Sequence, residues 1–229
     1  PDARLLVLRR HRPVAASTDG DRLRAVTVRD VSEQDRHIEA RFFIDGTPWG
    51  DLLALAKVEH RDGPESRAET GEPHAAEHPH PHDEQAVTVV FAMDHRPGED
   101  HTIERPRQYD HWRALEPPGW PGRLLAWTTV RPETHEPLTR RLFDAEDGKP
   151  WWEFRRILDR TNFEPSFAES DVTLVNWPHN DYWFGPLLGV SLEERERNLD
   201  AARQLSLSLL YWLQTEAPRP DGGVGSTDG

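Results

Sequence analysis

Cysteine is absent from the 229 residues, so disulfides, thiolate zinc sites and cysteine nucleophiles are excluded within this chain. The sequence also lacks an apolar run approaching the roughly 20 residues that span a bilayer, and it does not open with a signal peptide. Basic residues are few: 28 lysines and arginines stand against 41 aspartates and glutamates, for a net charge of −13. This charge disfavours nucleic acid and anionic membranes as partners, and we expect a cytoplasmic protein.

The nine tryptophans indicate a folded chain, because disordered segments are poor in aromatic residues. The length suits one large domain or two small ones. The sequence begins at Pro1 instead of a methionine, and residues 218–229 are rich in glycine. We therefore expect the middle section of a longer polypeptide, with 218–229 as a flexible terminus.

The first 45 residues predict a β-meander, since short apolar stretches alternate with turn signals. Asp19-Gly20-Asp21 is a turn of this kind. A short apolar helix is expected after the meander, at 52–56. The strands are expected at 1–8, continuing into 13–17, at 24–28 and at 38–44.

The rest of the chain predicts an antiparallel sheet, because strands follow one another without long intervening helices. Residues 59–84 are polar and rich in proline and histidine, which is typical of a long surface loop. The clearest helix runs from Ser191 to about Glu216, with capping-box spacing to Glu194, one apolar face, and Pro218 after its end. The other expected elements are strands at 85–93, 124–130, 152–158 and 172–177 and a short helix at 109–115.

The turn from Asp45 to Asp51 is the first candidate site. It joins a strand to a helix, and its glycines, Gly46 and Gly50, let a ligand approach the backbone closely. A helix N-terminus also favours anionic groups such as phosphate. The alternative is a simple strand-to-helix turn in which Asp51 caps the helix.

Two polar stretches of the long loop are further candidates. Arg67, in the charged run 65–72, carries a guanidinium suited to a carboxylate or phosphate, although such a run is also typical of a solvated loop. Histidine-rich tracts can bind metals, but the histidines here lack a preorganised helical spacing, so we expect them to be exposed and metal-free. They are His74, His78, His80 and His82.

The segment from Asn176 to Trp183 is the last candidate, because it follows a strand and combines an imidazole, amides, a carboxylate, a phenol and two indoles. This mixture of polar groups and flat apolar faces suits a ligand pocket. A histidine such as His179 titrates in the range that acid–base catalysis uses. The alternative is a turn whose tryptophans pack into the core.

Four blocks of the sequence, in order between about Ile38 and Glu216, resemble a large bacterial family of FAD-dependent oxidoreductases. In that family a strand-turn-helix usually reads isoleucine-aspartate-alanine-threonine-glycine, with glycine-aspartate-leucine shortly after. Here the stretch from Phe43 to Ala56 reads FIDGTPWGDLLALA. The further blocks are 65–72, 175–182 and 202–216.

The resemblance implies an α+β chain within a two-part protein: a Rossmann-type FAD domain completed by other segments, and a substrate domain with an antiparallel sheet. The pyrophosphate fingerprint G-x-G-x-x-G occurs nowhere in this sequence. We therefore expect a hetero-oligomer, in which companion chains carry this fingerprint and a C-terminal segment that returns to the flavin. The chain departs from the family at Gly46 and Pro48, and Pro48 removes one N–H donor toward the cofactor.

On this interpretation residues 1–58 complete the FAD domain, residues 59–217 form the substrate domain, and a hydride passes between an organic substrate and the flavin. His179 is the expected general base, oriented by Asp181. The expected site residues are His179, Asp181 and Tyr182 for catalysis; Asp45, Gly46, Thr47, Gly50 and Asp51 for the cofactor; and Arg67, Trp177 and Asn180 for the substrate. Two alternative functions stay open. One is a non-catalytic binding or assembly subunit that kept the fold. The other is a hydrolase, although no spacing of the carboxylates supports it.

Overall fold

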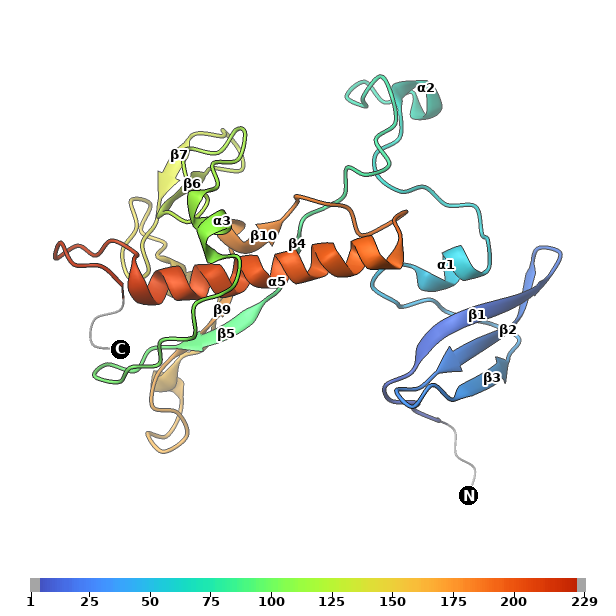
Figure 1. Cartoon of the computed structure of the whole chain (residues 1–229), viewed down its shortest axis with the longest axis horizontal. Helices are drawn as coiled ribbons and strands as arrows, with labels where there is room; N and C mark the ends of the chain where they lie inside the picture. Colours follow the sequence, from blue (N-terminus) through green and yellow to red (C-terminus); the bar gives the residue numbers. More distant parts are fainter. Residues whose placement is uncertain (1–4, 226–229) are drawn as a thin grey trace. The chain divides into compact units, whose positions relative to one another are not determined.

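Three antiparallel strands form the sheet of the N-terminal unit. They are β1 (Arg12–Asp19), β2 (Arg22–Arg29) and β3 (Asp35–Glu39), in the order β1-β2-β3. The computed structural model describes residues 5–225, and the chain divides into two compact units, 1–81 and 82–229 (Figure 1). On the central strand Val26 pairs with Ala16 on one side and Ile38 on the other, so an apolar row runs across the sheet.

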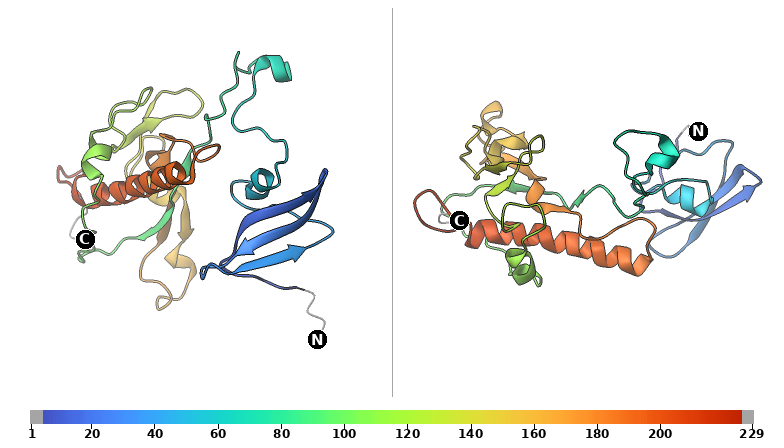
Figure 2. Two further views of the ribbon diagram at one scale, coloured as in Figure 1. Left: turned by 45° about the vertical axis from the view of Figure 1, so that its right-hand side comes forward. Right: turned by 90° about the horizontal axis from the view of Figure 1, so that it is seen from above.

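The predicted β-meander is confirmed, and both views in Figure 2 show its strands side by side. Gly20 makes the turn between β1 and β2 with a φ of 61°, a left-handed conformation that glycine adopts at little cost. Residues 5–8, predicted as the start of a strand, form none, and residues 1–4 lie outside the described part of the chain.

The strand predicted at 38–44 ends at Glu39, so this boundary was wrong. Apolar side chains suggested the longer strand, but residues 40–44 pair with no strand of the described chain. Phe42 and Ile44 are 84% and 94% exposed as a result.

Two short helices belong to the same unit: α1 (Asp51–Leu55), predicted at 52–56, and α2 (Arg67–Thr70). Helix α2 interrupts the stretch that the sequence predicts as a surface loop. The backbone N–H and the hydroxyl of Ser66 both donate to the carboxylate of Glu69, at 2.9 and 2.8 Å, which fixes the first turn of α2.

The C-terminal unit consists of small antiparallel sheets and one long helix, so the α+β class is confirmed. Its strands are β4 (Val87–Thr88), β5 (Phe91–Asp94), β6 (Thr128–Val130), β7 (Pro137–Thr139), β8 (Arg156–Leu158), β9 (Val172–Val175) and β10 (Asp181–Tyr182). Its helices are α3 (Tyr109–Ala114), α4 (Trp151–Phe154), α5 (Leu192–Thr215) and the 3-10 turns η1 (Arg160–Asn162) and η2 (Pro178–Asn180). The sheets have the orders β5-β9-β8, β10-β4 and β6-β7.

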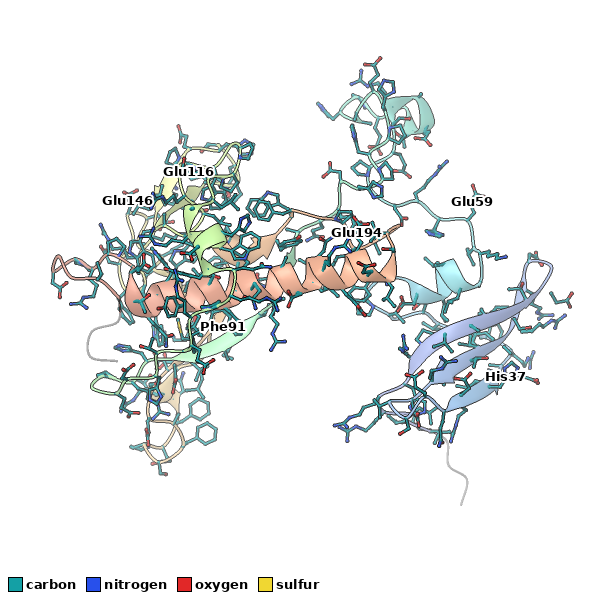
Figure 3. The ribbon with its side chains drawn as sticks, viewed as in Figure 1. His37, Glu59, Phe91, Glu116, Glu146 and Glu194 are labelled. Carbon is teal, nitrogen blue, oxygen red and sulfur yellow. The ribbon has the colours of Figure 1, made fainter. Side chains whose placement is uncertain are left out.

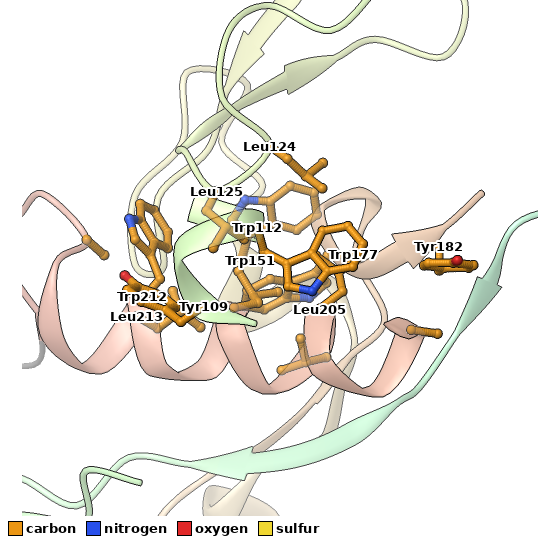
Figure 4. Close-up of a cluster of buried hydrophobic side chains, with 14 residues drawn as sticks. Tyr109, Trp112, Leu124, Leu125, Trp151, Trp177, Tyr182, Leu205, Trp212 and Leu213 are labelled. Atoms are coloured by element: carbon orange, nitrogen blue, oxygen red, sulfur yellow. The ribbon is translucent and has the colours of Figure 1, made fainter. Parts of the chain in front are cut away.

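Helix α5 carries the main core of this unit, and α3, η2, β4 and β10 pack against it. Its start is capped by Ser191, whose hydroxyl accepts from the N–H of Glu194 at 3.2 Å. The predicted apolar face is confirmed, since Leu205 and Leu209 are fully buried in the core. Figure 4 shows Leu205 among aromatic side chains. Phe91 on β5, labelled in Figure 3, packs against the same core. None of the described helices combines the length and the apolar character that crossing a bilayer requires.

Several predicted strands of the C-terminal unit differ from the structure, and in the stretch 124–130 only β6 is a strand. The stretch 85–93 divides into β4 and β5, because β4 pairs with β10 while β5 pairs with β9. In the stretch 152–158 only β8 is a strand, and Trp151 and Trp152 lie on the helical turn α4. Both indoles are buried, which successive residues of a strand on a one-sided sheet would not allow.

The domain limits predicted at 58/59 and 217/218 stay a prediction. The two structural units meet in sequence at Pro81 and His82. In the stretch predicted as a flexible terminus, residues 218–225 form a loop closed by a bridge between Pro218 and Val224, and residues 226–229 lie outside the described part. The strands of every sheet in residues 5–225 are antiparallel.

The buried face of α5 leads to a direct stability test. Leu205→Ala removes a side chain that is 0% exposed, and we expect the free energy of unfolding to fall by about 2–5 kcal/mol. Leu192→Ala makes the same change on the same helix where the side chain is 62% exposed, so it should cost less than about 0.5 kcal/mol. Urea denaturation followed by far-UV circular dichroism measures both. Equal losses in the two variants would contradict the placement of α5.

Candidate functional site

The predicted site segment Asn176–Trp183 is held in place by the buried side chain of Asn180. Its Oδ1 accepts from Trp177 N at 2.9 Å, and its Nδ2 donates to Ser206 Oγ on α5 at 3.2 Å. These bonds close the turn η2 and fasten it to the helix. The amide of Asn180, expected to contact substrate, is thus already engaged within the core, where Trp177 is also buried.

The buried ring of His179 packs against the rings of two tryptophans. Its ring centroid is 5.3 Å from that of Trp151 and 6.1 Å from that of Trp120, both edge-on. The residue is 1% exposed, and neither ring nitrogen has a hydrogen-bond partner within residues 5–225. Burial lowers the pKa of His179 to about 4, an effect that the nearby Ala126 backbone partly offsets. The imidazole is therefore neutral at pH 7.

The carboxylate expected to orient this histidine points elsewhere. Asp181 accepts from the hydroxyl of Thr88 across the β10–β4 pair, and burial raises the pKa of Asp181. No hydrogen bond joins Asp181 to His179 in the part of the chain that the structure describes. The general-base role of His179 stays a prediction.

Tyr182 lines a small cavity of about 220 Å³ together with Trp183 and Phe184. Its hydroxyl donates to Asn198 Oδ1 at 3.2 Å, and burial raises the pKa of Tyr182. The indole of Trp183 stacks on the ring of Phe184, with centroids 4.7 Å apart, and both are partly exposed. Of the predicted site residues in the C-terminal unit, Tyr182 has a place on a cavity wall.

In the N-terminal unit, the Asp45–Asp51 turn is closed by its own side chains. Asp45 Oδ1 accepts from the backbone N–H and the hydroxyl of Thr47, at 2.8 and 2.7 Å, and Oδ2 accepts from Leu52 N at 3.0 Å. Thr47 Oγ1 in turn accepts from Asp51 N at 2.8 Å. These bonds, above all the one from Thr47 N, lower the pKa of Asp45. A charged carboxylate therefore occupies the N-terminus of α1.

The two glycines of this turn have different roles. Gly50 is the residue that caps α1, with a φ of 63°, so Asp51 is the first helical residue instead of the cap. Gly46 has open space around it: a Cβ added there would meet no atom within 4 Å. The backbone at Gly46 is accessible to a ligand, although nothing in the fold of this unit requires a glycine there.

The remaining candidates, which belong to the N-terminal unit except for His82, are exposed. Arg67 lies on α2 and donates from Nη2 to Ala75 O at 3.1 Å. The histidines of the long loop are exposed as predicted. Residues 5–225 contain no group of three or more histidine, aspartate or glutamate side chains placed to hold a metal ion. The substrate role of Arg67 stays a prediction.

A cavity of about 740 Å³ in the C-terminal unit contains none of the predicted site residues. Its volume falls within the range of roughly 300–1,000 Å³ that is usual for small-molecule sites. The end of β5 and the loop after it, α4, and the second half of α5 with its following loop form the walls. The apolar part of the lining comes chiefly from Met93, Trp127, Phe143, Trp152 and Leu213.

Hydrogen bonds between distant segments fix these walls. Trp127 Nε1 donates to Pro218 O at 2.7 Å, and Trp152 N donates to Leu142 O at 2.9 Å. The side chain of Gln214 on α5 donates to His101 O at 2.8 Å and accepts from Ile103 N at 3.1 Å. The cavity is thus preformed, a property that lowers the entropic cost of binding.

A sequence signal for this cavity did exist. Asp94 is the last residue of β5 and His95-Arg96 follows it directly, just as the segment at Asn176 follows β9, and this stretch also mixes an imidazole with charged groups. The other walls come from segments up to about 130 positions away in sequence. Only the folded chain shows that they meet.

The sequence match with known proteins now identifies the family. The family model for FAD dependent oxidoreductases matches residues 2–227, and the chain belongs to this family. The cofactor of this family is FAD. No curated protein and no solved structure matches the chain.

The turn predicted to contact the cofactor does not form a cradle for the pyrophosphate of FAD. At the predicted turn the N–H groups of Asp51 and Leu52 already donate to Thr47 and Asp45. The negative charge of Asp45 would also repel a phosphate at that position. The predicted cofactor contacts of this turn stay a prediction, and the turn as it stands does not fit a phosphate group.

The buried histidine makes stability depend on pH. The pKa of His179 is about 4 in the folded chain and near 6.5 in the unfolded chain, so the unfolded state binds a proton first as the pH falls. This contribution is therefore fully present above about pH 6.5, and roughly 3 kcal/mol is lost by about pH 4. His179→Phe removes the proton-binding group but keeps a ring, so its unfolding free energy should lose less across this window. Urea titrations at several pH values measure the difference.

The exposed His74→Phe is the control, because its pH dependence should match that of the wild type. Parallel pH curves for the wild type and His179→Phe would contradict the buried, neutral state of His179.

Proposed function

We propose that the chain supplies the substrate-binding part of a FAD-dependent oxidoreductase, in which a hydride passes between an organic substrate and the flavin. One observation carries this proposal: a chain that matches the family over residues 2–227 holds a preformed cavity of ligand size in its C-terminal unit. The flavin supplies the electron chemistry. The residues of the chain bind the substrate, orient it and exclude water from it.

We further propose that another polypeptide or segment contributes the pyrophosphate fingerprint and the C-terminal flavin-side part, and so completes a Rossmann-type domain. The sequence contains no G-x-G-x-x-G, and the turn at Asp45 offers a phosphate no free helix N–H in its place. Among residues 5–225 the outer strands β1 and β3 each pair on one side only, and unpaired edges invite strand addition. Leu5, Leu6 and Phe42 near this sheet are also exposed, which suits a covering partner.

The rival function is a binding or assembly subunit without chemistry of its own. The closed turn at Asp45 favours it, because a chain that no longer held the cofactor would keep the fold and lose the phosphate site. Flavin content separates the two functions.

Co-expression gives the test. The 229-residue chain, tagged for purification, is produced alone and together with a polypeptide that carries the G-x-G-x-x-G segment. We expect the isolated chain to elute colourless from gel filtration, and the complex to elute with the visible absorption band of FAD and to bleach when its substrate reduces it. A complex without flavin would contradict the oxidoreductase proposal and favour the non-catalytic subunit. Stoichiometric FAD on the isolated chain would show that no companion is needed.

Gly46→Val tests whether FAD approaches the predicted turn. A Cβ at this position meets no atom of residues 5–225 within 4 Å, so the fold should be unchanged by circular dichroism. A cofactor against the backbone would collide with the valine, and we expect the flavin content of the complex to fall at least about 10-fold. Gly46→Ala, the smaller step, should reduce flavin content less. Full flavin content in Gly46→Val would remove the cofactor role of this turn.

A further inference from the structure

The larger cavity is lined by aromatic rings that face one another. The ring centroid of His95 is 5.2 Å from that of Phe143 and 6.1 Å from that of Trp152, and Phe143 and Trp152 are 5.4 Å apart. These rings are tilted or edge-on to one another instead of stacked flat. Rings arranged in this way present both faces and edges to a guest, and a guest with a ring of its own finds favourable partners there.

The charged groups of the lining are paired with one another. The arginine–aspartate pairs are Arg96 with Asp94 at 2.6 Å, Arg141 with Asp144 at 3.2 Å and Arg219 with Asp221 at 3.1 Å. Glu99 accepts from His101 at 2.6 Å. An anionic ligand would have to compete with these carboxylates for the guanidinium groups. A cationic ligand would have to compete for the carboxylates with three guanidinium groups and, at Glu99, with the imidazole of His101. The lining therefore favours a guest without a net charge.

One polar group remains to orient such a guest. Within residues 5–225, His95 takes part in no hydrogen bond or ion pair, and its ring is partly exposed beside Phe143. An imidazole both donates and accepts hydrogen bonds, so it can contact a hydroxyl or a carbonyl oxygen. A neutral ring compound with one oxygen function matches both the apolar walls and this contact.

We propose that this cavity binds an uncharged, ring-bearing alcohol or carbonyl compound, with its oxygen hydrogen-bonded to His95 and its ring against Phe143 and Trp152. An alcohol that gave up a hydride to the flavin and a proton from its hydroxyl would become a carbonyl compound, so this inference names the substrate class of the proposed function. The role of the bound compound as the substrate rests on the proposed function, whereas the binding site itself does not.

Three probes that share one ring system and differ in charge test the inference. They are 2-naphthol, 2-naphthoate and 2-(aminomethyl)naphthalene, which are neutral, anionic and cationic at pH 7. Isothermal titration of the full 229-residue chain, without flavin, measures each affinity. We expect 2-naphthol to bind at least about 10-fold more tightly than either charged probe, because the charged probes lose hydration without gaining a free counter-charge. Equal or tighter binding of a charged probe would overturn the inference.

Variants then place the bound probe. His95→Phe keeps the ring and removes the hydrogen bond, so 2-naphthol should bind about 5-fold more weakly. Phe143→Ala removes a half-exposed phenyl ring from the wall of the cavity and should weaken binding about 5-fold to 10-fold. The matched control is Phe167→Ala, which removes a similarly exposed phenyl ring outside the cavity and should leave binding unchanged.

Binding that is absent in the wild type, or unchanged in both His95→Phe and Phe143→Ala, would overturn the site, provided that circular dichroism shows folded protein. These results are independent of the flavin assay. A complex without FAD whose chain still binds 2-naphthol through His95 would leave the site standing and refute its role in hydride transfer.

Discussion

The stacking of Trp151 on Trp177 is the contact on which the C-terminal unit depends. Their centroids are 5.2 Å apart at 26°, and both indoles are 1% exposed. Trp151 lies on α4 and Trp177 just before η2, so the stack joins two segments that both meet the α5 core. The guanidinium of Arg140 covers Trp151 at 5.2 Å and is itself held by Asp147 at 2.6 Å. A cation over an indole adds to the apolar gain of burying both rings.

This stack links the core to the cavity. Because Trp151 turns inward on the helical turn α4, its neighbour Trp152 faces the larger cavity and forms part of its aromatic wall. His179, whose ring is edge-on to that of Trp151, is buried and stays neutral. One packing arrangement thus explains both the buried histidine and the shape of the proposed ligand site.

The Asp45–Asp51 turn resembles the family motif in sequence, but its own side chains occupy the N–H groups that a phosphate would need. Its resemblance to the family motif, together with three further blocks in the same order, pointed to the family, which the match over residues 2–227 confirms. Its geometry satisfies the helix N-terminus from within, through Asp45 and Thr47. The accessible backbone at Gly46 is the feature that a companion-held cofactor could still approach.

Local patterns in the sequence determined much of the fold. The turn at Gly20 placed the β-meander, and the cap at Ser191 with the apolar period of Leu205 and Leu209 placed α5, because turn and helix signals act between residues a few positions apart. The family followed from short blocks of the same kind. Strand ends were less well predicted, since a strand such as 38–44 exists only where a partner strand pairs with it.

The tertiary structure alone decided the sites. No sequence pattern near His179 predicts that its ring packs against Trp120 and Trp151, or that Asp181 accepts a hydrogen bond from Thr88 on another strand. The cavity beside His95 likewise needs segments spread over about 130 residues. Burial and charge pairing between distant segments set the pKa of a side chain and its access to a ligand, and these are properties of the folded chain instead of any local pattern.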